Sequence, residues 1–189
     1  MKKIISLLPI FAVICFFRLA AQTETEMKAW QNYMTPGEVH KMIAQSDGEW
    51  NEDITMWMDP AAPPTKTTAT AKNEMIMGGR YQLSKTTGNM MGMPFEGMSL
   101  VGYDNAKKTF TSVWIDNLGT GITTMEGGWD DASKSITFKG KMVDPMTGKD
   151  VSTRQVIKFL DIDTQEMEMY DTRNGKETKT MEIKLTKKK

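Results

Sequence analysis

The sequence predicts a mainly β protein in which about ten short antiparallel strands follow one another as an up-and-down meander. Three observations lead to this prediction. From Trp50 onward, apolar residues recur at every second position, as in strands that bury one face. Turns rich in glycine, asparagine and aspartate separate these segments at short intervals. No helical pattern lies between them that could connect parallel strands.

A meander of this length is expected to close on itself. Closure removes the unpaired strand edges that an open sheet would expose. A barrel of about eight or more strands encloses enough room for packed side chains or for one small ligand. We therefore predict a lipocalin-like barrel, with a two-sheet sandwich as the alternative.

The expected strands can be placed segment by segment. In the first, Ile54, Met56 and Met58 recur with period two. Before the last, the pair Asn174-Gly175 is a strong signal for the tight turn of a hairpin. The other strands are expected at residues 65–77, 80–87, 95–103, 109–116, 120–129, 135–142, 150–160, 166–171 and 177–186.

One or two short helices are expected within residues 22–47. The segment TEMKAWQNYM has apolar residues at helical spacing. In TPGEVHKMIAQ, Thr35 is expected as the N-cap, with Pro36 at the first helical position and Glu38 completing a capping box. His40, the only histidine, is expected on the surface of this second helix.

The N-terminus has the organisation of a secretory signal peptide. Lys2 and Lys3 precede an apolar run, and small residues end the segment at Ala21. The run is too short for a membrane-spanning helix. We therefore expect removal of residues 1–21 and export to the periplasm or the exterior. The mature protein would have no membrane span and would consist of the helical segment 22–47 and a barrel domain at 48–189.

Composition excludes several classes of function. Cys15, the only cysteine, lies in the expected signal peptide, so the mature chain has no thiol for a disulfide, a nucleophile or a metal site. Without Lys2, Lys3 and Arg18, 21 basic residues face 24 acidic ones, a net charge of −3. This balance gives no electrostatic reason to bind nucleic acid. The sequence leaves the oligomeric state open.

Patterns typical of catalysis and metal binding are missing from the sequence. One histidine cannot form a typical zinc site, and neither glycine-rich phosphate motif occurs. The acidic pairs at Asp130-Asp131 and Asp161-Ile162-Asp163 are interpreted as turn residues. We predict no catalytic residue, metal or cofactor, and the sequence favours a role that is not enzymatic.

A set of short motifs nevertheless resembles a known family. The chain is similar to the domain of unknown function 1579 family of bacterial proteins, many of which are exported. The resemblance covers nearly the whole mature chain and implies a lipocalin-like barrel, but it implies no activity. In chain order, its motifs are Trp30 with TPGEVH, GEW, GGRY, GMPFEG, GYD, WIDNLGTG and DPMTG.

Five polar and aromatic residues form the candidate ligand site: Arg80, Tyr103, Trp114, Asp116 and Thr120. Trp114 and Asp116 share one strand face, and a charge on such a face needs a partner. The guanidinium of Arg80 could supply it. The functional interpretation is a polar anchor for one end of a ligand. The structural alternative is a network that holds the turn at residues 117–119.

Methionine is abundant, with 18 in the chain, and its flexible side chain suits surfaces that accept varied apolar partners. The stretch GNMMGMPFEG concentrates Met90, Met91 and Met93 beside Gly92. We interpret it as a turn between strands. If this turn borders an open end of the barrel, the three methionines are candidates for its rim. A copper clamp is the alternative that soft thioethers would allow.

These observations lead to a prediction of function. We expect an exported β-barrel that binds a small apolar or amphipathic molecule in its interior. The alternative is a non-catalytic structural or interaction module with a solid barrel core and an exposed apolar patch.

Overall fold

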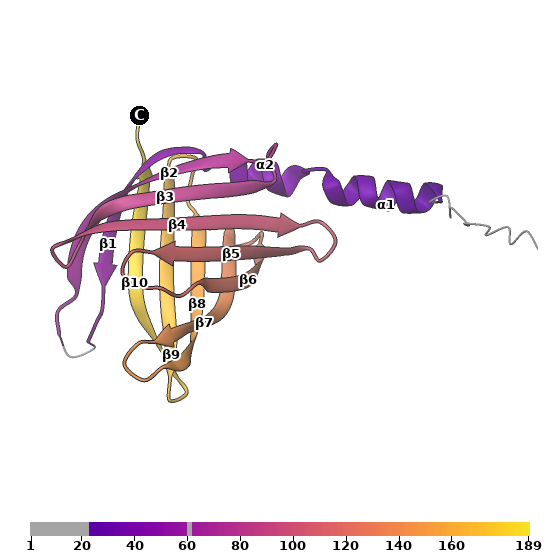
Figure 1. The fold of residues 1–189 in the computed structure, drawn as a ribbon. Coiled ribbons are helices and arrows are strands. Elements are labelled where there is room, and N and C mark those ends of the chain that lie inside the picture. The colour runs from indigo at the N-terminus through magenta and orange to yellow at the C-terminus, as the bar shows by residue number, and fades with distance from the viewer. Residues whose placement is uncertain (1–22, 60–61) are drawn as a thin grey trace, which may run out of the picture.

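The structure, a computed structural model, describes residues 23–59 and 62–189. The expected signal peptide at residues 1–21 lies outside these residues. Two helices precede ten strands (Figure 1). The elements are α1 (Glu24–Met34), α2 (Glu38–Ala44), β1 (Gly48–Met56), β2 (Thr65–Ile76), β3 (Tyr81–Met90), β4 (Met93–Asp104), β5 (Thr109–Asp116), β6 (Thr123–Asp130), β7 (Ser135–Asp144), β8 (Lys149–Phe159), β9 (Thr164–Arg173) and β10 (Lys176–Lys187).

The strands form one closed antiparallel barrel. Each strand pairs with the next in the chain, and β1 pairs with both β2 and β10. The predicted mainly β meander of ten strands is therefore confirmed, and the sandwich is excluded. Closure leaves no edge strand, so the alternating pattern places one side of every strand inside and the other side outside.

Two of the hairpins show why the chain reverses where it does. Met91 and Gly92 have φ angles of 52° and 81°, and Asn174 and Gly175 have 52° and 76°. Positive φ at both central residues matches the twist of the flanking strands in a two-residue turn. The predicted hairpin at Asn174-Gly175 is confirmed. Most of GNMMGMPFEG is strand, since only Met91 and Gly92 lie between β3 and β4.

The helices begin at different residues from those expected. Helix α1 has the capping box, between Thr23 and Glu26. The predicted N-cap of α2, Thr35, is wrong: Gly37 takes that position, and its N–H donates to Nδ1 of His40 at 3.1 Å. The Thr35 hydroxyl instead donates back to the carbonyl of Gln31 at 2.6 Å, so this residue ends α1.

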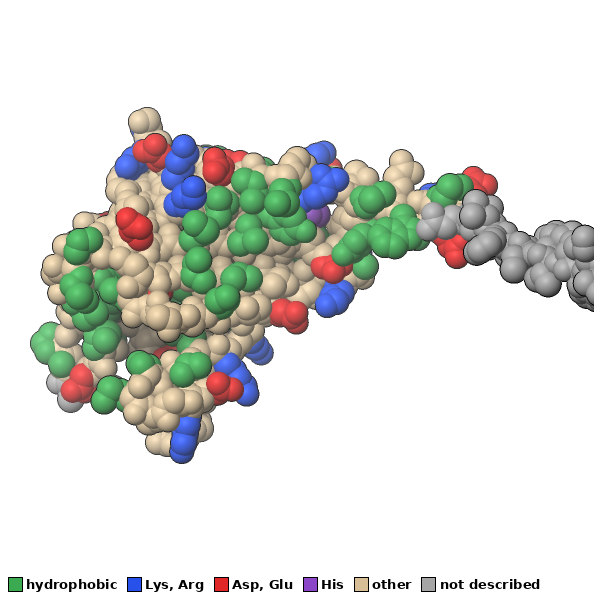
Figure 2. Space-filling view, in the orientation of Figure 1, with side chains coloured by type: hydrophobic (Ala, Val, Ile, Leu, Met, Phe, Trp, Pro, Cys, Tyr) green, Lys and Arg blue, Asp and Glu red, His purple; other side chains and the backbone are tan. Residues whose placement is uncertain are grey.

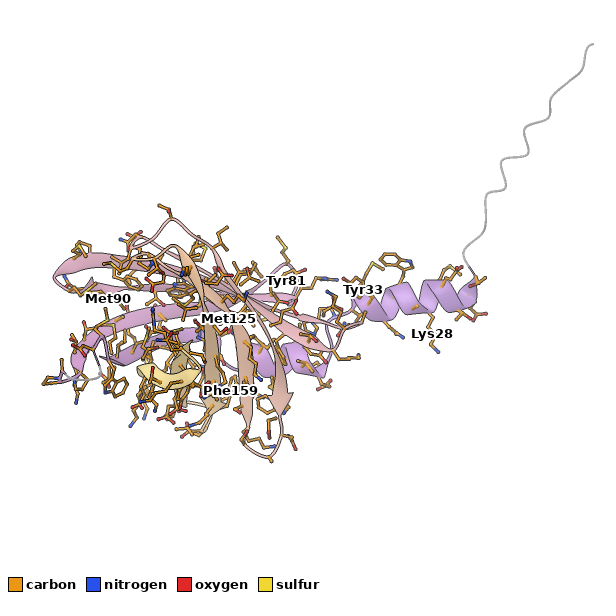
Figure 3. The ribbon with its side chains drawn as sticks, turned by 90° about the horizontal axis from the view of Figure 1, so that it is seen from below. Lys28, Tyr33, Tyr81, Met90, Met125 and Phe159 are labelled. Carbon is orange, nitrogen blue, oxygen red and sulfur yellow. The ribbon has the colours of Figure 1, made fainter. Side chains whose placement is uncertain are left out.

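Helix α1 projects away from the barrel and buries none of its residues (Figures 1 and 3). Its C-terminal carbonyl groups, which lack partners within a helix, are bound by side chains of the barrel. The amide of Asn105 donates to the carbonyls of Asn32, Tyr33 and Thr35 at 2.8 to 3.2 Å. These bonds fix the direction in which the helix leaves the barrel.

The barrel core consists of two clusters, one toward each end. At the end that we call the capped end, Ile43 of α2 packs with Phe110, Met125, Ile136 and Phe138. At the opposite end, which we call the far end, the cluster contains Ile54, Met56, Ala69, Met90, Phe95 and Ile183. Within the described residues, no helix lies over the far end, which is formed by the loops after β1, β3, β5, β7 and β9.

Candidate functional site

The five predicted site residues do not form one site, because the structure divides them between the two barrel ends. Arg80 lies in the turn after β2, at the capped end. Its Nη2 donates to the carbonyl of Met34 at 2.6 Å and its Nη1 to that of Met77 at 3.0 Å. Arg80 therefore helps Asn105 to hold the C-terminus of α1.

Tyr103 lies near Arg80, so two of the five predicted residues meet at the capped end. The ring of Tyr103 packs against Phe110 and against His40, with centroid distances of 4.8 and 5.9 Å. A hollow of about 320 Å³ between the end of α1 and the barrel is lined in part by His40, Arg80 and Tyr103.

His40 is buried, with 5 % of its surface exposed, so the expected surface position is wrong. Desolvation lowers the pKa of its imidazole, and the charge of Arg80 lowers it further. A hydrogen bond with the backbone of Tyr103 raises the pKa but does not outweigh these two effects. Nδ1 accepts the Gly37 N–H, which requires an unprotonated nitrogen. His40 is thus a neutral side chain that starts α2 and packs on Tyr103.

Trp114 and Asp116 lie at the far end. The indole N–H of Trp114 donates to Oδ2 of Asp116 at 2.7 Å, and the N–H of Leu118 donates to Oδ1 at 2.9 Å. The expected pairing of Arg80 with Asp116 is wrong, since β2 and β5 end at opposite ends of the barrel. Asp116 instead holds the turn that follows it, as the structural alternative predicted.

Gly97 makes room for Trp114. A Cβ at Gly97 would lie 2.4 Å from the Trp114 ring, so any larger residue would displace the indole. The ring stacks on Phe95 at a centroid distance of 6.3 Å and borders the far-end cluster. Thr120, the fifth predicted residue, is exposed in the loop after β5.

The three predicted rim methionines all lie at the far end, but they have different environments. Met90 points inward and is buried in the far-end cluster, whereas Met91 and Met93 are exposed. Further large apolar side chains are exposed around them (Figure 2). We call the exposed set the apolar rim: Met58, Met91, Met93, Leu118, Ile122, Val143 and Met146.

The interior contains an acidic residue that the sequence analysis missed. Glu52 points inward from the middle of β1 and is 6 % exposed. Its neighbours across the sheet are Ala69 on β2 and Leu185 on β10. No described group donates a hydrogen bond to its carboxyl or forms an ion pair with it. Burial alone raises the pKa of Glu52 to about 7.

The other buried polar groups of the barrel differ from Glu52. They either form hydrogen bonds with other protein groups or are uncharged. The Thr153 hydroxyl donates to Asp171 at 3.0 Å, and the Gln165 amide donates to the hydroxyl of Ser46 at 2.6 Å. Thr86 and Ser112 are buried neutral hydroxyls. Among the described residues, Oδ1 of Asn73 is the only fully buried side-chain oxygen or nitrogen without a hydrogen-bond partner.

A second hollow, of about 560 Å³, lies along β1, β2 and β3. Its lining includes Glu52, Ala69 and Gly88. The other lining residues are exposed and alternate with these three along the strands. Most of this hollow therefore lies on the outer face of the barrel.

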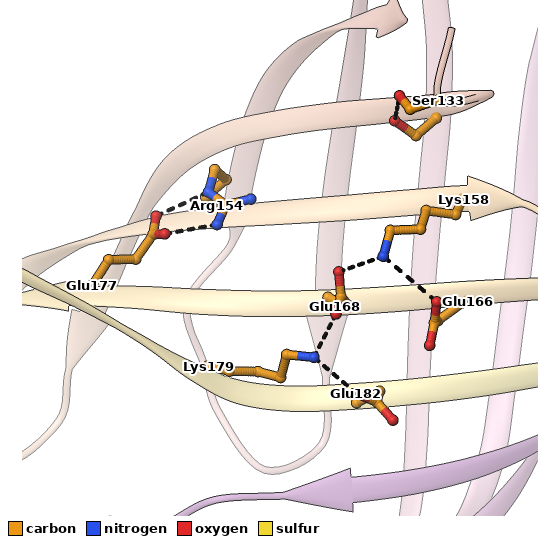
Figure 4. A network of polar contacts seen from close by, with 9 residues as sticks. Ser133, Arg154, Lys158, Glu166, Glu168, Glu177, Lys179 and Glu182 are labelled. Carbon is orange, nitrogen blue, oxygen red and sulfur yellow. Dashed lines mark hydrogen bonds and ion pairs between the residues drawn. The ribbon is translucent and has the colours of Figure 1, made fainter.

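The strongest charge network lies on the outer face of β8, β9 and β10 (Figure 4). Glu168 accepts from Lys158 at 2.8 Å and from Lys179, and Lys179 also binds Glu182 at 2.9 Å. Hydrogen bonds from the two lysines lower the pKa of Glu168 to about 2. Because these charges pair with one another, the network is interpreted as a surface that ties β8, β9 and β10 together.

In the part of the chain that the structure describes, no three His, Cys, Asp or Glu side chains are grouped so that they could hold a metal ion. No helix among the described residues is long and apolar enough to cross a bilayer.

Comparison with known proteins identifies the family. Residues 35–187 match the family described as "Protein of unknown function (DUF1579)". The chain belongs to the DUF1579 family. The sequence-based recognition of this family is therefore confirmed, and no curated protein matches this DUF1579 chain.

Among solved structures, the DUF1579 chain is similar to the crystal structure of Rv2717c from M. tuberculosis. The TM-score is 0.59 at 12 % sequence identity, and the match covers 82 % of this chain and all of the other. At this level of identity the likeness shows the fold alone.

Proposed function

We propose that this DUF1579 protein is exported and binds a small apolar or amphipathic molecule, which enters the barrel at the far end. The observation that carries the proposal is the apolar rim. Large apolar side chains are exposed there on four successive hairpin loops or their flanks, and the buried far-end cluster lies below them.

The energetics of the rim support a binding role. Each exposed apolar side chain forgoes about 25 cal/mol per Å² that burial would contribute. Soluble proteins keep such groups together mainly where something binds. Four of the seven rim residues are methionines, whose unbranched, polarizable side chains adapt to ligands of different shapes.

The test uses the mature chain, beginning at Gln22, and Nile red, a neutral apolar dye whose fluorescence rises in apolar surroundings. Saturable binding with one site per chain is expected. Met91→Lys should weaken it by about threefold or more, because a hydrated ammonium then lies at the entrance.

Met77→Lys is the matched control. Met77 and Met91 both precede glycine in a turn, with φ of 51° and 52°, and they are 70 % and 63 % exposed. Only Met91 belongs to the apolar rim, so only its variant should lose affinity. Absence of saturable binding, or an equal loss in both variants, would contradict the proposal.

The alternative, an interaction module, is favoured by a different surface. Leu83, Leu100 and Val113 lie side by side on the outer face of β3, β4 and β5, and Met98 and Ile115 pair next to them. Figure 2 shows apolar side chains gathered on the visible face of the barrel. If this surface carries the function, the double variant Met98→Lys/Ile115→Lys should abolish self-association or partner capture in native mass spectrometry while dye binding remains.

A further inference from the structure

We infer that the ligand has a hydrogen-bond donor at its polar end, an ammonium or a hydroxyl group, and that this group binds the carboxyl of Glu52. The inference rests on the proposed function, and it names the class of molecule that the barrel would accept.

The first step is the isolation of Glu52. Along β1 its inward neighbours are Trp50 and Ile54, and across the sheet they are Ala69 and Leu185. The one donor among these four side chains, the indole N–H of Trp50, is already bound to the carbonyl of Ser46 at 2.9 Å. A buried charge without a partner is costly, so structures keep one mainly where it serves a function.

The second step is the space beside the carboxyl. Neither oxygen of Glu52 has a protein hydrogen-bond partner, and neither is fully buried, since Asn73 Oδ1 is the only fully buried and unpartnered atom of its kind among the described residues. Both oxygens therefore border space large enough for a water molecule. On the neighbouring strand β2, the residues paired with Glu52 and Trp50 are Ala69 and Ala71. Their small side chains leave room beside the carboxyl of Glu52.

The third step is the charge of the groups buried inside the barrel. Among the described residues no lysine or arginine is buried, and the buried imidazole of His40 lies on α2 at the capped end. An anionic head group would therefore meet Glu52 without a compensating cation. A donor or a cation would gain a charge-assisted hydrogen bond in surroundings of low dielectric constant.

The fourth step is the depth of the site. Glu52 precedes Ile54 and Met56 on β1, and the latter two belong to the far-end cluster. A molecule that enters through the apolar rim would pass these side chains before it reaches the carboxyl. The polar end of the ligand would then lie innermost, with its apolar chain against Ile54, Met56 and Met90.

The experiment compares three probes that share one chain and differ in the head group: decylamine, decanol and decanoate. Each displaces Nile red from the mature protein at pH 8, below its aggregation concentration. The expected order of affinity is decylamine, then decanol, then decanoate, with at least about tenfold between the first and the last.

Glu52→Gln should remove the preference, leaving amine and carboxylate within about threefold of each other. Asp53→Asn is the matched control: it removes one carboxylate from the adjacent, outward-facing position and should leave the order unchanged. The affinity for decylamine should also fall as the pH drops from 8 to 5, because Glu52 becomes protonated.

The outcomes separate the two claims. If no probe and no dye binds, the proposed function itself fails. If dye binds but decanoate competes as well as decylamine, or if Glu52→Gln keeps the order, a donor-headed ligand is ruled out and Glu52 is only a hydrated interior acid.

Discussion

The two ends of the barrel are built from the same alternating strands, yet they differ in how the interior is covered. At the capped end, Ile43 of α2 enters the barrel and is buried among aromatic rings. At the far end, comparable side chains such as Met91 and Ile122 are left exposed. Among the described residues, α2 covers one end of the barrel and no helix lies over the other.

The seal at the capped end is made by polar bonds as well as by packing. Barrel side chains bind the carbonyls at the end of α2: Gln82 donates to Ile43, and both Trp50 and Asn73 donate to Ser46, at 2.9 to 3.1 Å. Asp47 accepts the N–H of Met75 at 3.0 Å. At the far end, side-chain bonds join the ends of the strands themselves: Asn117 donates to the carbonyl of Pro94, and Arg173 donates to Asp144.

The largest expected effect tests this contrast directly. Ile43→Ala should reduce the free energy of unfolding by about 2–5 kcal/mol, because it removes a buried anchor and leaves a cavity. Leu118→Ala, at the exposed far end, should change it by less than about 0.5 kcal/mol. Urea denaturation of both variants measures the difference. Equal losses would show that α2 does not seal its end.

The next effect concerns Glu52, which lies between the two ends, and the dependence of protein stability on pH. The folded state holds the pKa of Glu52 at about 7, above the ordinary value of 4.5. The folded protein therefore binds the proton more tightly, and the ionised form is penalised. The penalty is absent below pH 4.5, grows as the pH rises to 7, and is complete above it.

Glu52→Gln should accordingly stabilise the protein relative to the wild type by about 2–3 kcal/mol more at pH 8 than at pH 4.5. Denaturation at the two pH values, with Asp53→Asn as the control, measures this. A difference that does not depend on pH would mean that the carboxyl of Glu52 is solvated or paired when the protein is folded.

The smallest effect is expected at the loop after β5. Asp116→Ala removes the acceptor of both the Trp114 indole and the Leu118 N–H, and should cost about 1 kcal/mol, because water can replace the lost bonds at this partly exposed position. Urea denaturation reports the change. A loss above about 3 kcal/mol would show that the far end is as tightly built as the capped end.

Much of the fold could be predicted from the sequence, because period-two alternation and turn residues are local signals. The pattern that begins at Trp50 and continues through Ile54 and Met56 gave the right face of β1. Glu52 lies on the same face of β1 as Trp50, Ile54 and Met56. The alternation alone could therefore have identified it as an acidic residue that points into the barrel. That its cross-strand neighbours, Ala69 and Leu185, supply no hydrogen-bond donor follows from the register with β2 and β10, which the sequence does not show.

The error at Arg80 has a topological cause. In an up-and-down barrel, turns after even strands lie at one end and turns after odd strands at the other. Arg80 follows the second strand and Asp116 ends the fifth, so the strand order alone would have separated them. The burial of His40 could not be predicted in this way, because the docking of α2 depends on long-range packing against Tyr103.

The central claim is that the far end admits an apolar molecule and the capped end does not. The methionines of the two ends allow a direct test by NMR of protein labelled with ¹³C at the methionine methyl groups. On titration with decanol, the signals of Met56, Met90 and Met91 should shift, whereas those of Met42, Met75 and Met77 should stay in place. Shifts confined to the second group, or no shift at saturating decanol, would contradict the claim.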